Sequence, residues 1–204
     1  MPGRSAVVAA LLLIGSPLKA QVSITTGNCT PNAAALEDRV ACFVMVRKYD
    51  DADGVIRLIA PSELDRLATE FRARLDLYNR LPGRSPSDRL AALVDSLGLK
   101  QSANSRAQIA TLHEEIFRRI ERGESSSQLV VPYLRIAYLP HVLRPLAVEP
   151  TEVSIAERTD SSATLYLTER VGVLTGAQHN STVTRYIFLW RRIAAVWYIV
   201  GLRA

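Results

Sequence analysis

The last quarter of the chain, residues 153–202, constrains the fold most, because it reads as consecutive β-strands joined by short turns. Three stretches are rich in β-branched and aromatic residues and suit a pleated surface: ATLYLTERVGV, STVTRYIFLW and AVWYIVGL. The segments between them, residues 159–162 and 176–180, have the Gly, Asn, Asp and Ser content of turns. The pattern predicts an antiparallel meander.

A loop centred on Ala177 would fix the register of this meander. It sets Glu169 opposite Arg185 and gathers the aliphatic residues of three strands on one face. The other face then collects large aromatic rings, namely Tyr166, Tyr186, Phe188, Trp190 and Trp197. With apolar residues on both faces, each face of the sheet needs a cover.

Residues 1–20 have the features of a secretory signal: a basic leader with Arg4, an apolar run over residues 6–14, and small Ala20 before the expected cut. The alternative, an uncleaved anchor, is disfavoured because the apolar run is shorter than the ~20 residues that span a bilayer. The sequence thus predicts a periplasmic or secreted protein without a membrane span after cleavage.

The charge pattern gives no reason to expect a nucleic-acid partner. The formal net charge is +5, and it becomes +3 when Arg4 and Lys19 are removed with the signal. The remaining basic residues are spread along the chain instead of forming the patch that binds phosphates.

Residues 33–204 are predicted to form one α+β domain after an N-terminal coil at residues 21–32. Apolar residues recur at three- and four-residue steps before the meander, which indicates helices at residues 32–49, 62–81, 86–97 and 105–122. Residues 53–59 form a short apolar piece between the first two. Helices followed by a meander predict helices packed on one face of a curved antiparallel sheet, in a cone-like arrangement.

Residues 128–149 are apolar but interrupted by Pro132, Pro140 and Pro145. Because proline breaks both helices and central strands, this segment is predicted to form short extended pieces and turns along the sheet.

The two cysteines, Cys29 and Cys42, would be exported to a compartment where a disulfide persists. The sequence predicts one bridge between them, tying the leading coil to the first helix. Two buried free thiols are the alternative.

No motif predicts a metal or a cofactor. Asp51-Ala52-Asp53-Gly54 resembles part of a calcium loop, but Tyr49 and Ala60 stand where the first and last ligands belong, so an ordinary turn at a helix end is favoured. His113-Glu114-Glu115 lacks the second histidine of a zinc helix. The three histidines at positions 113, 141 and 179 are therefore interpreted as solvated or hydrogen-bonded structural residues.

The helix carrying Leu36, Val40 and Phe43, the segment YDDADGVIRLI at residues 49–59, and the closing Trp197-Tyr198-Ile199-Val200 resemble the nuclear transport factor 2-like superfamily, also called SnoaL-like or ketosteroid-isomerase-like. The resemblance implies helices packed as a cone against a curved sheet, with a conical cavity. The chain departs from that family in its long helical section and in the turn Arg192-Ile193-Ala194-Ala195. The family includes isomerases, dehydratases, ligand carriers and non-catalytic domains, so the fold alone does not select a function.

Two functions are predicted as alternatives. The favoured one is a non-catalytic exported domain that binds a partner chain or a small apolar ligand. The other is a small cavity enzyme, which needs a carboxylic acid whose pKa is raised by burial inside the cone.

Glu169 is the only acid that the predicted register places on the aliphatic face. It can be a cavity base, but an ion pair with the facing Arg185 is favoured, because an adjacent guanidinium keeps a carboxylate ionised. Tyr133, Tyr138 and His141 could also reach a cavity, so no catalytic residue is assigned from the sequence.

The aromatic face leads to a prediction about assembly. In the family that the chain resembles, dimers that pack sheet against sheet are common, so a homodimer across this face is predicted. The alternative is that residues 128–149 lie over the aromatic rings and complete the core.

Overall fold

The computed structural model describes residues 20–21, 33–98, 103–139, 149–175 and 178–203. These residues form an α+β fold in which the helices come before nearly all of the sheet, as the sequence predicted. The helices are α1 (Leu36–Lys48), α2 (Ala52–Leu58), α3 (Pro61–Arg80), α4 (Pro86–Ser96), α5 (Ala103–Glu121) and α6 (Ser126–Ala137). The strands are β1 (Ala20–Gln21), β2 (Glu149–Ala156), β3 (Ser162–Thr175), β4 (Gln178–Ile193) and β5 (Val196–Arg203).

The sheet is antiparallel throughout and follows the order of the chain, from β1 to β5. The predicted meander is therefore confirmed. Ala194 and Ala195 form the two-residue turn between β4 and β5, and both have positive φ angles of 46° and 68°. A tight turn with two positive φ values matches the twist of the strands that it joins.

Local sequence signals explain several helix boundaries. Asp51 caps α2, its side chain accepting a hydrogen bond from the backbone N–H of Gly54 at 2.9 Å. The segment Asp51-Ala52-Asp53-Gly54, which resembled part of a calcium loop, is thus a helix cap. Ser85 and Asp88 form a reciprocal capping box at the start of α4, where Pro86 takes the first helical position.

Helix α6 corrects the prediction of extended pieces in residues 128–149. Pro132 lies inside this helix and cannot bond to the carbonyl of Gln128 four residues earlier. Arg119 of α5 donates to that carbonyl at 3.2 Å and so satisfies the group that proline leaves open. Ser125 and Gln128 cap the start of the helix. The remainder, residues 140–148, lies outside the described residues.

The register of β3 and β4 differs by one residue from the predicted one. Thr175 pairs with Gln178, so only two residues connect the strands, and Glu169 pairs with Thr184 instead of Arg185. A two-residue connection is the commonest for a hairpin. Because side chains alternate between faces, this slip moves every side chain of β4 to the opposite face from the predicted one.

The prediction that five aromatic residues share the face opposite the aliphatic one is therefore wrong. Phe188, Trp190 and Trp197 lie on the same face as Leu165 and Leu167, and all five are at most 3% exposed. Tyr186 also packs against this core, whereas Tyr166 lies on the other face of the sheet. The chain's own helices already bury most of those rings, so this register gives no support to a homodimer through a shared aromatic face.

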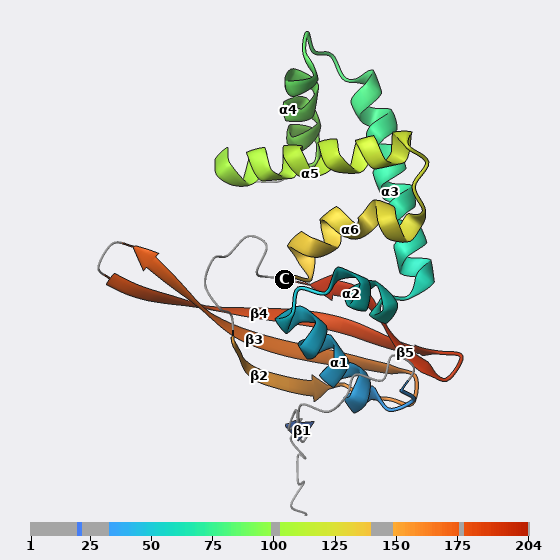
Figure 1. Ribbon diagram of the computed structural model, residues 1–204, viewed down its shortest axis with the longest axis vertical. Coiled ribbons are helices and arrows are strands. Elements are labelled where there is room, and N and C mark those ends of the chain that lie inside the picture. Colours follow the sequence, from blue (N-terminus) through green and yellow to red (C-terminus); the bar gives the residue numbers. More distant parts are fainter. Residues whose placement is uncertain (1–19, 22–32, 99–102, 140–148, 176–177, 204) are drawn as a thin grey trace, which may run out of the picture.

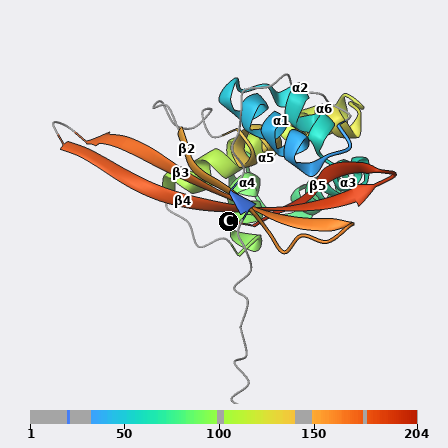
Figure 2. The same cartoon turned by 90° about the horizontal axis from the view of Figure 1, so that it is seen from below.

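We call the face that carries Leu165, Phe188 and Trp190 the inner face, and the opposite one the outer face. Helices α1, α2 and α6 lie together on one side of the sheet (Figure 2). The main core joins them to the inner face, and α6 contributes Leu129, Val130 and Leu134 to it. Part of residues 128–149 thus does complete the core, which was the intramolecular alternative to the dimer.

Helices α4 and α5 lie farther from the sheet than α1 and α2 (Figure 1). They pack with the second half of α3 around a smaller cluster of Leu90, Leu93 and Phe117. Among the described residues, no helix is long and apolar enough to cross a membrane. Residues 1–19, and with them all of the predicted signal except Ala20, lie outside the described part of the chain. Ala20 and Gln21, the first residue of the predicted coil, form β1.

Candidate functional site

A buried ion pair lies on the inner face. Arg47 of α1 donates from Nη2 to Oε1 of Glu169 on β3, and these residues are 4% and 2% exposed. An ion pair involving Glu169 was predicted, but its partner is Arg47 and not Arg185. The adjacent guanidinium compensates the charge of this buried carboxylate.

Aromatic rings enclose the guanidinium of Arg47. Its Cζ atom lies 5.4 Å from the ring centroids of Phe43 and Tyr186 and 5.6 Å from that of Phe188. Phe43 precedes Arg47 by one helical turn, so α1 presents both side chains to the same patch of the sheet. Cation–π contacts of this kind strengthen as the cation is removed from water.

The carboxylate of Glu169 is only half satisfied. Its Oε2 atom is buried and has no hydrogen-bond partner within the described residues. A buried carboxylate oxygen without a partner costs free energy, so it is a potential acceptor for a water molecule or a ligand donor.

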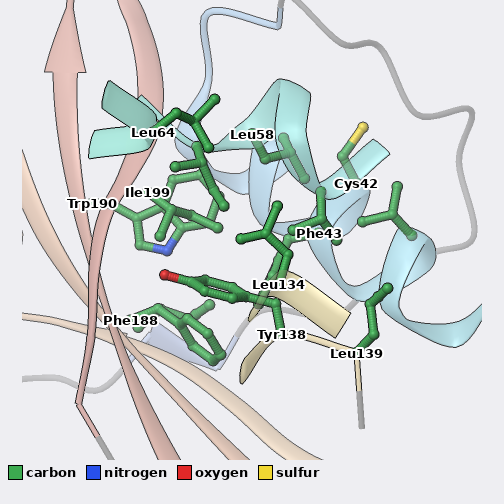
Figure 3. Packing of buried hydrophobic residues seen from close by; sticks show 14 of the residues in the cluster. Cys42, Phe43, Leu58, Leu64, Leu134, Tyr138, Leu139, Phe188, Trp190 and Ile199 are labelled. Atoms are coloured by element: carbon green, nitrogen blue, oxygen red, sulfur yellow. The ribbon is translucent and has the colours of Figure 1, made fainter. Parts of the chain in front are cut away.

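A second buried polar group lies farther along the inner face. The indole Nε1 of Trp190 is buried without a hydrogen-bond partner in the described structure. The hydroxyl of Tyr138 is directed toward this indole (Figure 3). Burial raises the pKa of Tyr138 well above its ordinary value, so this hydroxyl is protonated at neutral pH. Leu134 and Ile199 lie beside the two rings (Figure 3).

Arg39 fastens α1 to the sheet from a fully buried position. Its Nε donates to the carbonyl of Trp197 at 2.8 Å, and its Nη2 donates to the carbonyl of Arg57 at 3.2 Å. Burial lowers the pKa of Arg39 from its ordinary value. Both acceptors are backbone carbonyls, so Arg39 joins α1, α2 and β5 structurally.

His113 of α5 is also buried and hydrogen-bonded, in agreement with its interpretation as a structural residue. Its Nδ1 lies 2.8 Å from the carbonyl of Ile109, and its Nε2 lies 3.0 Å from Nη1 of Arg74. Nδ1 therefore donates and Nε2 accepts, which requires the neutral ring. Burial, opposed by the bond to Ile109, lowers the pKa of His113, and the cation of Arg74 lowers it further.

This network predicts acid sensitivity. The unfolded chain binds a proton at His113 below pH ~6.5, whereas the folded chain resists protonation because its pKa is lowered. The contribution of His113 to stability is therefore complete above that pH and is lost as the pH falls toward the folded pKa. Denaturant unfolding from pH 7.5 to 4.5 should show a decline that His113→Gln flattens; an equal decline in that variant would contradict the assignment.

The outer face carries a shallow groove of about 300 Å³. Its lining side chains come from β2, β3 and β4 and from the residue after β2; they are Glu152, Ser154, Ala156, Glu157, Tyr166, Thr168 and Arg185. We call this the outer-face groove. The mixture of one basic and two acidic residues with a tyrosine suits a charged, polar partner surface more than a purely apolar ligand.

The pairing of the strands sets three of these residues in one row. Glu152 pairs with Thr168, and Thr168 pairs with Arg185, so an acid and a base flank a central threonine. Neighbouring strands lie ~4.8 Å apart, which separates the two charged residues by roughly 10 Å. Neither forms an ion pair within the described part of the chain. The guanidinium of Arg185 lies 6.0 Å from the ring of Tyr166.

The residues considered from the sequence are thus distributed over different regions. Glu169 and Tyr138 both face the core, Arg185 is on the outer face, and Tyr133 packs against Phe71, with 5.7 Å between ring centroids. His141 lies outside the described residues.

Sequence reasoning missed Arg47, the partner of Glu169. Its only signal was a basic residue one turn after Phe43, on the stripe that α1 buries.

The described residues contain no metal-binding cluster, meaning no group of three or more His, Cys, Asp or Glu side chains that could hold a metal ion.

Comparisons with protein-family models, with curated proteins and with solved structures gave no match.

Proposed function

We propose that this chain is an exported, non-catalytic domain that binds a second copy of itself through the outer-face groove. The observation that carries the proposal is the row of Glu152, Thr168 and Arg185, which holds two unpaired opposite charges on a face that the described helices leave open. The surface differs from the aromatic face first predicted, but the kind of partner is the same.

A two-fold axis makes this row complementary to itself. If the axis runs along β3 between two stacked sheets and passes over Thr168, each Glu152 lies over the Arg185 of the other copy. Two opposite-charge pairs form, and a C2 interface of this kind closes after two copies. Desolvated charge pairs add specificity to such an interface and exclude partners of the same sign.

Charge reversal tests the proposal. Glu152→Arg or Arg185→Glu alone should shift the dimerisation equilibrium toward monomer by at least about tenfold, since like charges then face each other. The double variant should restore dimers, because both pairs reform with their signs exchanged. Sedimentation equilibrium measures this shift; dimers that are insensitive to both single variants, or a monomeric wild-type chain, would refute it.

The resemblance to the nuclear transport factor 2-like superfamily remains part of the proposal. The support for it is the order of helices and meander and the helical cover of the inner face. A small apolar ligand is less favoured as the occupant of that face, since Phe188 and Ile199 there are already fully buried by protein side chains. Native mass spectrometry of the chain purified from its own compartment tests for a retained ligand.

Export is proposed from the N-terminal signal pattern. Cys42 is buried in α1, whereas Cys29 lies outside the described residues. A bridge between them stays a prediction. Thiol titration of the unfolded, unreduced protein is expected to find no free thiol, and two free thiols would contradict it.

The cavity enzyme is the second candidate, and the unpartnered Oε2 of Glu169 is the observation in its favour. A base at this position would have to release Arg47 before taking a proton. Exchange of deuterium into the α-carbon of small ketones, followed by NMR, should then occur in the wild-type chain and disappear in Glu169→Gln. Exchange that is absent in both would remove this candidate.

A further inference from the structure

The β3–β4 hairpin extends past the strands on either side of it. β2 pairs with β3 only as far as Arg170, and β5 pairs with β4 only between Ile187 and Ile193. Residues 178–186 of β4 therefore have β3 as their only strand neighbour in the described structure. This end of the hairpin projects beyond the helices (Figure 1).

The edges at β2 and β5, in contrast, have backbone partners. In the full chain, Ala20 and Gln21 of β1 pair with the open side of β2, and cleavage of the proposed signal after Ala20 leaves Gln21 at this position. The open side of β5 is met at Ile199 by the chain entering α3, where the N–H of Ala60 donates to the carbonyl of Ile199 at 2.9 Å. Proteins generally cover or block sheet edges, because unpaired backbone groups recruit other strands. The edge over residues 178–186 has no such cover among the described residues.

The sequence of this edge also lacks the usual blocking residues. Residues 178–184 read QHNSTVT, with no proline, lysine or acid. Proline and inward-pointing charges are the devices that keep other strands away, and threonine and valine favour strand pairing. The edge is therefore chemically open to an incoming strand.

The turn indicates which backbone groups are available. Thr175 and Gln178 pair across a two-residue connection. In a hairpin of this type the two closing residues form a hydrogen-bonded pair. Hydrogen-bonded and non-bonded pairs alternate along an antiparallel ladder, so His179, Ser181 and Val183 belong to the non-bonded pairs with β3. Their backbone N–H groups are therefore directed away from β3, to the open edge.

We propose that residues 178–186 of β4 bind an extended, uncharged segment of a different protein by strand addition. Nine residues of strand span roughly 30 Å, enough for a segment of similar length. Apart from Arg185, which lies at the β5 end and whose side chain is on the outer face, the edge carries no lysine, arginine or acid. It therefore favours an uncharged segment, because charges next to a new backbone ladder would lose water without gaining a partner. Main-chain hydrogen bonds supply the affinity, and alternate side chains supply the specificity.

A second copy of the chain fits this edge less well than a segment of a different protein does. This conclusion rests on the proposed outer-face dimer. The outer-face dimer closes with two copies and leaves one open edge on each. If these edges paired with one another, dimer would add to dimer without closing, and the chain would form filaments. A segment from another protein fills each edge once.

A displayed library of nine-residue peptides tests the proposal, with the whole exported chain as the target. Selected peptides should lack charge at their central positions and lose affinity when a central residue is changed to proline. Val183→Pro removes an edge N–H and should weaken binding by at least ~10-fold. Val183→Thr keeps that N–H and serves as the matched control, with binding close to wild type.

Amide hydrogen exchange gives a second measurement that does not depend on the folding of the proline variant. Bound peptide should slow exchange at residues 179, 181 and 183 of the wild-type chain. Failure to select any peptide, or peptides that protect other residues only, would overturn the proposal. Filament growth without peptide would assign the edge to a second copy and overturn it as well. Glu152→Arg should bind the peptide as wild type does, so a failed outer-face dimer is distinguishable from a failed edge.

Discussion

Replacing Arg47 with methionine is expected to lower the free energy of unfolding by about 3–5 kcal/mol. The substitution keeps most of the side-chain volume among Phe43, Tyr186 and Phe188 but leaves the charge of Glu169 buried without its partner. An uncompensated buried carboxylate is far more costly than the loss of the ion pair itself. Urea unfolding monitored by circular dichroism at neutral pH measures the change.

The matched control removes both charges together. Arg47→Met combined with Glu169→Leu should recover most of the lost stability, since a buried ion pair is often no more stable than apolar residues of similar size. A double variant that is as unstable as Arg47→Met alone would show that the loss comes from packing and not from the isolated charge.

Phe188→Ala should also be strongly destabilising, by about 3–5 kcal/mol, because it removes a fully buried ring from the main core. Ile187→Ala is the matched control on the same strand. Ile187 is half-buried on the outer face, so its truncation should cost roughly 1 kcal/mol. The two values, measured by the same unfolding experiment, report directly which face of β4 is turned toward the helices.

This pair of variants decides between the two registers. A slip of one residue would exchange the positions of Phe188 and Ile187 relative to the core. Equal losses, or a larger loss for Ile187→Ala, would contradict the register in which Thr175 pairs with Gln178.

The same strand shows where prediction from sequence reaches its limit. The strands and most helices were predictable, because apolar periodicity and turn residues specify elements locally. The register was not, since β4 carries apolar residues on both faces and either one satisfies the pattern. What selects between them is the length of the turn and the helical cover, and neither can be read from the strand alone.

Long-range contacts explain the other differences. The pairing of Glu169 with Arg47 depends on where α1 crosses the sheet, and no local pattern encodes that placement. Helix α6 was missed because Pro132 normally breaks a helix, and the compensating donor, Arg119, belongs to another helix. The caps at Asp51 and Ser85, in contrast, involve residues three apart and follow from local chemistry.

The most direct test of the central claim is a cross-link at the proposed two-fold axis. Thr168→Cys should be joined to the same position of a second copy by a bismaleimide that spans the ~10 Å between sheets packed face to face. Wild-type protein and Arg72→Cys, whose side chain is exposed on α3, serve as controls for reaction elsewhere. Covalent dimer at dilute protein with Thr168→Cys alone is the predicted result. Dimer yields equal to those of Arg72→Cys would contradict binding through the outer-face groove.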